Sequence, residues 1–374
     1  MSQQFSKMKV GILGGGQLAR MLIQQGQRLG LRMHVLCPGE EDPAALVTRH
    51  WHQGSPTKES DLRRFFAQVD VVTFESEFLD ALQLQQVAEG TGTPLFPRPE
   101  LMGKLQDRLI QKQLLEKYKI TTSPFMEVSN RNQLDEALQK FPKGLVLKKR
   151  RFGYDGYGTF IVRNRQNASK VEGLLSEVKD GFIAESFVTF RRELALMAVR
   201  SINGEVSFLP LVESQQKDNR CFWVKGPLRH RSLGAITKKI KTLLGEIDYV
   251  GAIGFEFFDT AQGLVVNEVA PRVHNSGHYS LDALNSDQFT LHIKALLGMK
   301  LGTVELRKPG FAMLNLLGEM GGPPTWNLPP NLNLHWYGKS DNRPGRKMGH
   351  LTALGSGPQT ALARLLKAKK EFHL

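Results

Sequence analysis

Residues 1–101 alternate short apolar runs with segments whose apolar positions recur at helical spacing. The strand-like runs are Lys9–Leu13, Arg32–Leu36 and Val69–Phe74, and the helical segments are Gln17–Leu29, Lys58–Gln68 and Asp80–Glu89. Strands that alternate with helices are typical of a parallel sheet covered by helices. The pattern therefore predicts an α/β, Rossmann-like N-terminal domain over residues 1–101.

The pattern changes after residue 101. Met102–Tyr118 has the spacing of one long amphipathic helix. It is followed by segments that predict an α+β unit, namely a strand at Gly144–Lys148, a helix near Ala168–Val178 and a strand at Phe182–Glu185. After Leu297 the sequence becomes rich in proline, glycine and asparagine. We expect a central domain over residues 102–298 and a small C-terminal domain over residues 299–374.

Two alternating apolar runs near residue 260 predict a β-hairpin. Gly251–Phe258 and Leu264–Val269 flank turn residues, and pairing about a turn centred near Gln262 places Glu256 opposite Glu268. Carboxylates on opposed strand positions have Cβ atoms roughly 5 Å apart and repel each other. A divalent cation such as Mg²⁺, held by two carboxylates and substrate phosphates, would relieve that repulsion. The alternative is a solvated sheet face that tolerates both charges.

The amino-acid composition is that of an ordinary globular protein. The chain has 374 residues, 41% of them hydrophobic and 23% charged, and its start is polar without an apolar stretch of the roughly 18 residues that a membrane span needs. We therefore expect no membrane segment and no export. The only cysteines, Cys37 and Cys221, form no metal-binding pattern and favour a reducing, cytoplasmic location.

The net charge is +14, which suggests an anionic partner. Basic residues are nevertheless dispersed, and only Lys148–Arg151 and Lys367–Lys370 are clustered. Neither cluster is interleaved with the aromatic residues that a single-strand platform carries. Solvated faces are the favoured interpretation of both, and a basic nucleic-acid-binding protein is the disfavoured one.

Glycines at the end of the first strand indicate a ligand loop or close packing. Gly14-x-Gly16-x-x-Ala19 matches the dinucleotide fingerprint. The second strand, however, ends Leu36-Cys37-Pro38 and lacks the acidic residue that holds a ribose, which disfavours an NAD-dependent oxidoreductase. Two interpretations remain, a site for another small anionic or polar ligand and close packing of strand against helix.

A second set of glycines follows a run of four bases. Phe152-Gly153-Tyr154-Asp155-Gly156-Tyr157-Gly158 comes directly after Lys148–Arg151. Backbone amides of such a loop can close over a phosphate, with a preceding lysine as the point charge. A simple hairpin turn is the alternative.

Several strings resemble the ATP-grasp enzymes, specifically the 5-(carboxyamino)imidazole ribonucleotide synthase family. They span nearly the whole chain in the family's order: Gly14–Met21, Asp107–Lys112, Gly153–Gly156, Asn267–His278 and Arg343–His350. The resemblance implies a Rossmann-like pre-ATP-grasp domain, a central ATP-grasp fold with a lid at about residues 120–186, and a small C-terminal domain.

The resemblance also implies a reaction and its residues. ATP phosphorylates bicarbonate to carboxyphosphate, whose carboxyl group passes to the exocyclic amine of 5-aminoimidazole ribonucleotide in purine biosynthesis, leaving ADP and phosphate. The implied ATP-binding residues are Arg108, Lys148, Gly153, Tyr154, Asp155, Gly156, Gly158, Glu185, Ser186, Phe187, Val188, Glu193, Gln216, Asn267 and Glu268. The implied Mg²⁺ ligands are Glu256 and Glu268, and the residues that face bicarbonate or carboxyphosphate are Arg272, His274 and Asn275. Those that receive the ribonucleotide are Gln17, Glu75, Tyr154, Asp155, Lys339 and Arg346.

The resemblance further implies a homodimer that acts on small molecules. The nearest alternative is another ATP-grasp carboxylate-amine ligase, such as a formate-dependent purine enzyme. The chain departs from the family pattern at Phe152, where many relatives carry glycine, at Tyr157, where they carry a base, and at Glu213-Ser214, where they carry Glu-Asn.

Overall fold

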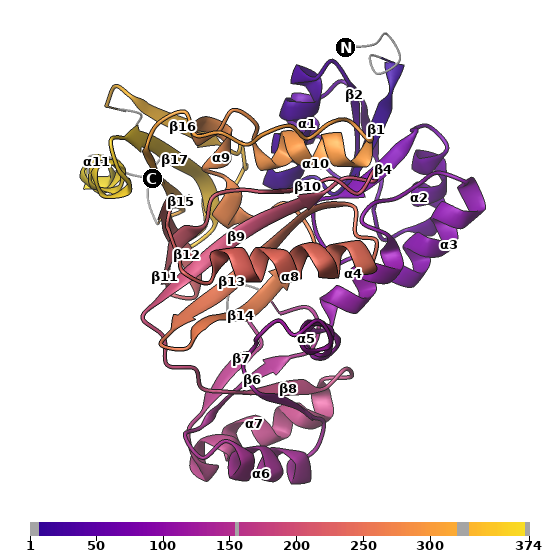
Figure 1. Cartoon of the computed structure of the whole chain (residues 1–374). Coiled ribbons are helices and arrows are strands. Elements are labelled where there is room, and N and C mark those ends of the chain that lie inside the picture. Colours follow the sequence, from indigo (N-terminus) through magenta and orange to yellow (C-terminus); the bar gives the residue numbers. More distant parts are fainter. Residues whose placement is uncertain (1–6, 154–156, 320–328, 371–374) are drawn as a thin grey trace.

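The computed structural model describes residues 7–153, 157–319 and 329–370, and these residues build three β-sheets. Figure 1 shows a unit rich in helices near the N-terminus, a long central sheet and a smaller sheet with two helices that extends away from it.

The N-terminal unit is a parallel sheet in the order β3-β2-β1-β4. Its strands are β1 (Lys9–Leu13), β2 (Arg32–Cys37), β3 (Trp51–Gln53) and β4 (Val71–Phe74), and its helices are α1 (Gln17–Arg28), α2 (Glu59–Phe66) and α3 (Ala81–Thr91). The predicted strands and helices are all present, and the short edge strand β3 and a 3-10 helix at Ala45–Val47 were not anticipated. The predicted α/β, Rossmann-like arrangement is confirmed.

The single helix predicted over Met102–Tyr118 is wrong, because it is broken at Asp107. Helices α4 (Pro99–Gln106) and α5 (Arg108–Lys117) meet there, and Asp107 has extended dihedral angles. Its carboxylate accepts a hydrogen bond from the backbone N–H of Leu109 at 3.0 Å and pairs with Arg150 at 2.6 Å. A capping carboxylate begins a new helix more readily than it continues an old one, so the break places Arg108 at the start of α5.

The smaller sheet is antiparallel, in the order β5-β8-β6-β7. Its elements are β5 (Phe125–Val128), α6 (Arg131–Lys140), β6 (Leu145–Lys149), β7 (Thr159–Val162), α7 (Arg165–Glu177) and β8 (Phe182–Ser186). The two helices pack on the sheet over a separate apolar core that includes Val128, Leu134, Leu147 and Phe182. This core makes the segment a compact subdomain, and Figure 1 shows that it lies at the end of the molecule far from the N-terminal unit.

The central sheet has nine strands, eight of them in the order β14-β13-β9-β11-β12-β15-β17-β16, with β10 paired to β9. They are β9 (Arg192–Arg200), β10 (Val206–Phe208), β11 (Val212–Lys217), β12 (Arg220–Gly226), β13 (Gly251–Thr260), β14 (Gly263–Ala270), β15 (Gly310–Leu317), β16 (Leu332–Trp336) and β17 (Lys347–Gly355). Its accompanying helices are α8 (Leu233–Glu246), α9 (Ser280–Ala283), α10 (Gln288–Leu296) and α11 (Pro358–Lys370). The C-terminal strands therefore continue the central sheet.

The predicted hairpin is confirmed as β13 and β14, with a register that depends on a β-bulge. Thr260 lies opposite Gly263, and counting back from that pair would put Asn267 opposite Glu256. A shift between Glu256 and Phe257 skips Asn267 and sets Glu256 opposite Glu268. Bulges re-aim side chains in this way and are frequent beside active sites. The predicted opposition of the two glutamates is correct because of the bulge.

Candidate active site

The carboxylates of Glu256 and Glu268 form the centre of the candidate site. Both side chains keep contact with solvent, at 28% and 42% exposure. Burial, reinforced by the negative charges of Glu268 and Glu193, raises the pKa of Glu256 to about 8. The pair therefore strongly favours either a proton or a cation between its strands.

The carboxylate oxygens of Glu256 and Glu268 are ligands of the kind that a hard cation prefers. Within residues 7–153, 157–319 and 329–370, no group of three or more His, Cys, Asp or Glu side chains is arranged to hold a metal ion. Two carboxylates that leave further positions to phosphate oxygens and water are the donor set that Mg²⁺ uses in nucleotide sites. Glu256 and Glu268 fit that pattern.

Arg108 connects the carboxylate pair to the glycine loop. Its Nη2 donates to Glu268 Oε1 at 3.0 Å and to the carbonyl oxygen of Gly153 at 3.2 Å, and its Nη1 donates to the carbonyl oxygen of Lys149 at 3.3 Å. The Arg108 side chain is 13% exposed. The Arg108 guanidinium thus binds both the backbone of the glycine loop and Glu268, a predicted Mg²⁺ ligand.

Lys148 approaches the same centre from the smaller sheet. Its Nζ donates to Asn267 Oδ1 at 3.0 Å and lies 3.1 Å from Glu185 Oε1. Glu185 also pairs with Lys112 Nζ at 3.1 Å. Lys112 was not among the predicted site residues, although its burial could have been inferred from its place on the apolar face of α5.

Arg150 and Arg151 are paired within the fold, so the solvated face expected for Lys148–Arg151 is wrong. Arg150 lies 2.6 Å from both Asp107 and Glu127, and Arg151 donates to Gln106 Oε1 at 3.1 Å. These contacts join the smaller sheet to the break between α4 and α5. The run therefore supplies internal ion pairs, which leaves less of its charge for a nucleic-acid surface.

The loop after β14 carries Arg272 and His274 next to the carboxylates. Arg272 Nε donates to Glu77 in a very short contact, and its Nη1 donates to the carbonyl oxygen of Val273 at 3.1 Å. His274 Nε2 lies 3.8 Å from Glu256 Oε1. Burial, with the positive charge of Arg272, lowers the pKa of His274 to about 3. His274 is therefore neutral at physiological pH.

Asn275 is turned toward the C-terminal strands. Its amide exchanges hydrogen bonds with Asn315 of β15 at 2.9 and 2.7 Å, and Asn315 Nδ2 also donates to the carbonyl oxygen of Cys221. Gln288 holds the same loop from the other side through the backbone N–H and carbonyl oxygen of His274. The catalytic loop predicted from sequence is thus fixed by side chains of β15 and α10.

Glu75 lies against two of the three glycines at the start of α1, Gly14 and Gly16, whereas Gly15 packs against Asp42 and Cys37. The backbone N–H groups of Gly16 and Ala19 donate to its two carboxylate oxygens at 2.5 and 3.1 Å. A Cβ on Gly14 or Gly16 would lie 2.7 Å from this carboxylate, and Gly14 has φ +105°. A helix N-terminus attracts anions, and here the protein's own carboxylate occupies it. Close approach of Glu75 thus accounts for Gly14 and Gly16 in this structure, and a site for a small ligand at the same turn stays a prediction.

Lys339 and Arg346 lie on the C-terminal segment that reaches toward Glu75. Burial, with the charges of Arg346 and Lys347, lowers the pKa of Lys339 to about 8, while the charge of Glu75 opposes that shift. Arg346 pairs closely with Asp341, and Lys339 Nζ donates to the carbonyl oxygen of Lys347 at 2.7 Å. Gln17, in the first turn of α1, completes the described part of the predicted ribonucleotide group.

Glu193 and Gln216 lie together on the central sheet. Burial raises the pKa of Glu193, and a hydrogen bond from the Gln216 side chain opposes that shift. Ser186, Phe187 and Val188 are partly buried at the end of β8, whereas the Glu185 side chain is 4% exposed and directed at two lysines. The predicted residues Tyr154, Asp155 and Gly156 lie outside the described residues, and Gly158 follows them with φ +77°.

Phe152 adopts a left-handed backbone conformation, with φ +59°. Its ring is half exposed and lies 6.3 Å from that of Phe78. Because glycine tolerates this conformation and a Cβ does not, we expect Phe152→Gly to be more stable than Phe152→Ala by about 1 kcal/mol. Urea unfolding of both variants measures the difference. The matched pair Lys241→Gly and Lys241→Ala, in the middle of α8, should give the opposite order; the same order at both positions would contradict the strain.

Comparisons with known proteins agree with this geometry. Three family models match in the order of the fold: the ribonucleotide synthetase preATP-grasp domain over residues 7–106, the ATP-grasp domain over 113–289 and the phosphoribosylaminoimidazole carboxylase C-terminal domain over 312–364. An N5-carboxyaminoimidazole ribonucleotide synthase from Synechococcus elongatus is 37% identical, across 93% of this chain and 90% of that protein.

Solved structures of related enzymes match this structure over nearly the full length of the chain. The N5-carboxyaminoimidazole synthetase of Staphylococcus aureus, complexed with ADP, has a TM-score of 0.88 and 30% identity over 97% of each chain. The Aspergillus clavatus synthase, in complex with ADP and 5-aminoimidazole ribonucleotide, has a TM-score of 0.85 and 28% identity over 98% of each chain. On these matches, the chain belongs to the N5-carboxyaminoimidazole ribonucleotide synthase family of ATP-grasp enzymes.

Proposed function

We propose that this chain uses Mg²⁺ and ATP to phosphorylate bicarbonate, and transfers the resulting carboxyl group to the exocyclic amine of 5-aminoimidazole ribonucleotide. The products are N5-carboxyaminoimidazole ribonucleotide, ADP and phosphate. The observation that carries the proposal is the opposed pair Glu256 and Glu268, with Arg108, Lys148 and Arg272 around it.

The first half of the reaction is a phosphoryl transfer. An oxygen of bicarbonate attacks the γ-phosphorus of ATP, a new O–P bond forms, and the bond to the β-phosphate oxygen breaks to release ADP. Such transfers depend on positioning and on neutralising charge. Mg²⁺ held by Glu256 and Glu268 would neutralise phosphate charge, while Arg108 and Lys148 bind phosphate oxygens. Ser186–Val188 would line the adenine, and Glu193 with Gln216 would hold the ribose.

The second half is carboxyl transfer to the amine. Carboxyphosphate releases phosphate as its carboxyl carbon becomes bonded to the amine nitrogen, and the departing phosphate accepts the amine proton. Arg272 and neutral His274 would face the carboxyl group; His274 Nε2 lies 3.8 Å from Glu256, and the charge of Glu268 acts on the Arg272 guanidinium. Lys339 and Arg346 would bind the ribonucleotide phosphate, and Gln17, Glu75, Tyr154 and Asp155 its remaining parts.

ADP release tests the proposal. The purified protein is assayed with Mg²⁺-ATP and bicarbonate, with and without 5-aminoimidazole ribonucleotide, and the carboxylated product is followed with ¹⁴C-bicarbonate. Strong stimulation by the ribonucleotide, with label transferred to it, is expected. Formate with glycinamide ribonucleotide is the control pair, because a formate-dependent ligase would respond to that pair alone. ATP turnover only with other acceptors would rule out the named substrate.

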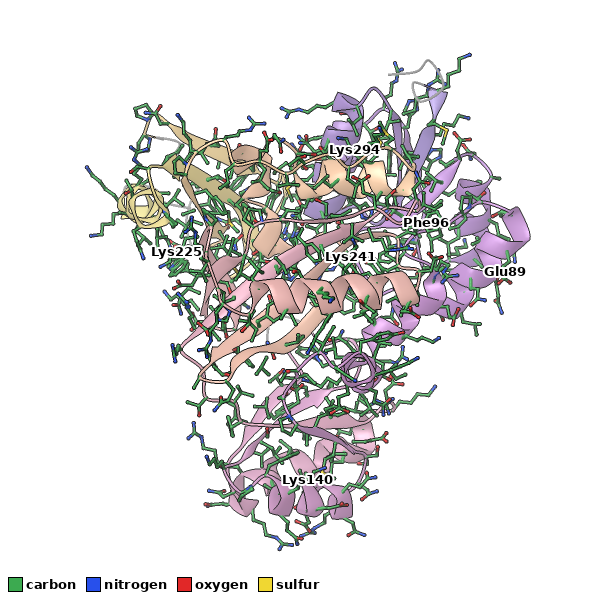
Figure 2. The ribbon with its side chains drawn as sticks, in the orientation of Figure 1. Glu89, Phe96, Lys140, Lys225, Lys241 and Lys294 are labelled. Carbon is green, nitrogen blue, oxygen red and sulfur yellow. The ribbon has the colours of Figure 1, made fainter. Side chains whose placement is uncertain are left out.

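The proposal includes a cytoplasmic homodimer without a nucleic-acid partner. Figure 2 shows Lys140, Lys241 and Lys294 on α6, α8 and α10, so basic side chains lie on several separate helices. Among the described residues no helix is both long and apolar enough to cross a membrane. Light scattering on the protein as it elutes from a size-exclusion column would test the dimer.

The domain boundaries near residues 101 and 298 and the lid at about 120–186 are part of the same proposal, and limited proteolysis with and without ADP would test them.

A further inference from the structure

We propose that Lys112 is a positioning residue for phosphoryl transfer, which balances Glu185 so that Lys148 stays directed at the nucleotide phosphates. This inference rests on the proposed function only for the identity of the nucleotide. Lys112 itself lies too deep to touch a substrate, because its side chain is 2% exposed.

Three charged side chains from three elements form a buried row. Glu185 on β8 lies between Lys112 on α5 and Lys148 on β6, with one carboxylate oxygen 3.1 Å from each Nζ. The exposed fractions of the three side chains are 4%, 2% and 15%. In the register of β6 and β8, Glu185 pairs with Val146, so Lys148 is its diagonal neighbour on one face. Only Lys148, at the end of this row, borders the site.

Lys112 is held by two hydroxyl groups in addition to Glu185. Its Nζ donates to Thr122 Oγ1 at 2.6 Å and to Ser123 Oγ at 2.9 Å, and Ser123 in turn donates to Glu185 Oε2 at 2.8 Å. Thr122 Oγ1 donates to the carbonyl oxygen of Val266, one residue before Asn267. The segment after α5 therefore fixes Lys112 relative to β14 as well as to the smaller sheet.

The charges indicate why a second lysine is needed. Burial alone would raise the pKa of Glu185, but Lys148, Lys112 and the Ser123 hydroxyl hold it at about 2. Burial lowers the pKa of Lys112 to about 8 against the pull of Glu185. The positive charge of Lys112 cancels part of the field of Glu185 at Lys148, so Glu185 attracts Lys148 less strongly than a lone carboxylate would. Lys148 can therefore also bond Asn267 Oδ1, at 3.0 Å, beside Glu268.

Removing Lys112 should therefore act through Lys148. In Lys112→Met, Lys148 is the remaining lysine beside Glu185, so the carboxylate attracts it more strongly and draws its Nζ away from the phosphate position. We expect at least a 10-fold weaker affinity for a fluorescent ADP analogue and a 10-fold to 100-fold lower kcat for ATP turnover, in the range of losses seen when a positioned charge is displaced. Lys104→Met is the matched control, because Lys104 pairs with Glu100 on an exposed helix face, and it should leave both quantities unchanged.

A second substitution separates positioning from simple support of the fold. In Lys112→Met combined with Glu185→Gln the unbalanced carboxylate is gone, so ADP affinity should recover by about 10-fold relative to Lys112→Met, a non-additivity typical of contacting residues. A double variant as weak as or weaker than Lys112→Met would overturn the inference, as would wild-type affinity in Lys112→Met. If Lys112→Met fails to fold, Lys112→Gln, which keeps a donor without the charge, provides the same comparison.

The two proposals fail in different ways. If the wild-type protein releases no ADP with 5-aminoimidazole ribonucleotide and Lys112→Met still weakens ADP binding, the proposed substrate is wrong and the role of Lys112 stands. If the wild type is fully active and Lys112→Met matches it in both kcat and ADP affinity, the role of Lys112 is wrong and the proposed function stands.

Discussion

Glu268→Gln is expected to lower kcat for bicarbonate-dependent ATP turnover by about 100-fold or more, because charge at the centre of a phosphoryl-transfer site acts mainly on the transition state. The substitution removes one of two carboxylates at the proposed metal position and the partner of Arg108, 3.0 Å away. It retains side-chain size. The Mg²⁺ concentration for half-maximal activity should rise at the same time, since a neutral amide binds Mg²⁺ weakly. Initial rates of ADP release across a Mg²⁺ titration measure both effects.

Two variants control this experiment. Glu246→Gln, on the exposed end of α8, should behave as wild type. Glu256→Gln should resemble Glu268→Gln in its Mg²⁺ dependence, because the two carboxylates face each other across β13 and β14. Full activity of Glu268→Gln at the wild-type Mg²⁺ requirement would exclude the carboxylate pair as the metal site.

Arg272→Lys is expected to reduce carboxylation of the ribonucleotide by about 100-fold while affecting ADP affinity far less. Lysine keeps the charge but lacks the planar fork with which a guanidinium binds two oxygens of a carboxyl or phosphoryl group. Arg272 also pairs with Glu77 of the N-terminal unit, so that contact fixes the position of its guanidinium. Product formation from ¹⁴C-bicarbonate, together with ADP titration, separates the two effects.

The conservative control is Arg364→Lys, on the exposed face of α11, which should retain wild-type rates. Circular dichroism and the thermal midpoint of Arg272→Lys should show whether the partly buried pair with Glu77 also supports the fold. A variant that folds normally and carboxylates at more than about half the wild-type rate would show that the guanidinium does not act on the carboxyl group, because the loss of one well-placed donor costs about 100-fold.

The β13–β14 hairpin shows which structural features can be predicted from neighbouring residues and which cannot. Alternating apolar residues and turn residues are short-range signals, and they were sufficient to predict both strands, whereas the opposition of Glu256 and Glu268 also needs a bulge. The bulge at Asn267 was not predicted, because the pairing was assigned from the position of the turn alone, although the two adjacent polar residues Asn267 and Glu268 interrupt the alternation there. That bulge places the Asn267 amide within reach of Lys148.

The glycine turn at Gly14–Gly16 shows the opposite case. Its residues match a ligand-binding pattern, and nothing local distinguishes a bound anion from an internal carboxylate. Glu75 lies 59 residues from Gly16 along the chain and fills the position through the sheet pairing of β1 and β4. Likewise, the Asp107 carboxylate that caps α5 is also paired with Arg150, which lies 43 residues away.

By itself, the sequence determined the periodicity of the elements, the parallel N-terminal sheet, the glutamate hairpin and the ordered motifs of the family, because each of these is written in neighbouring residues. The tertiary structure alone decided which charges meet: Lys112 with Glu185, Arg108 with Glu268, Arg272 with Glu77 and Asn275 with Asn315. These partners lie 40 or more residues apart in the chain. Electrostatic pairing depends on distance in space and on burial, and neither quantity exists until the sheets have packed.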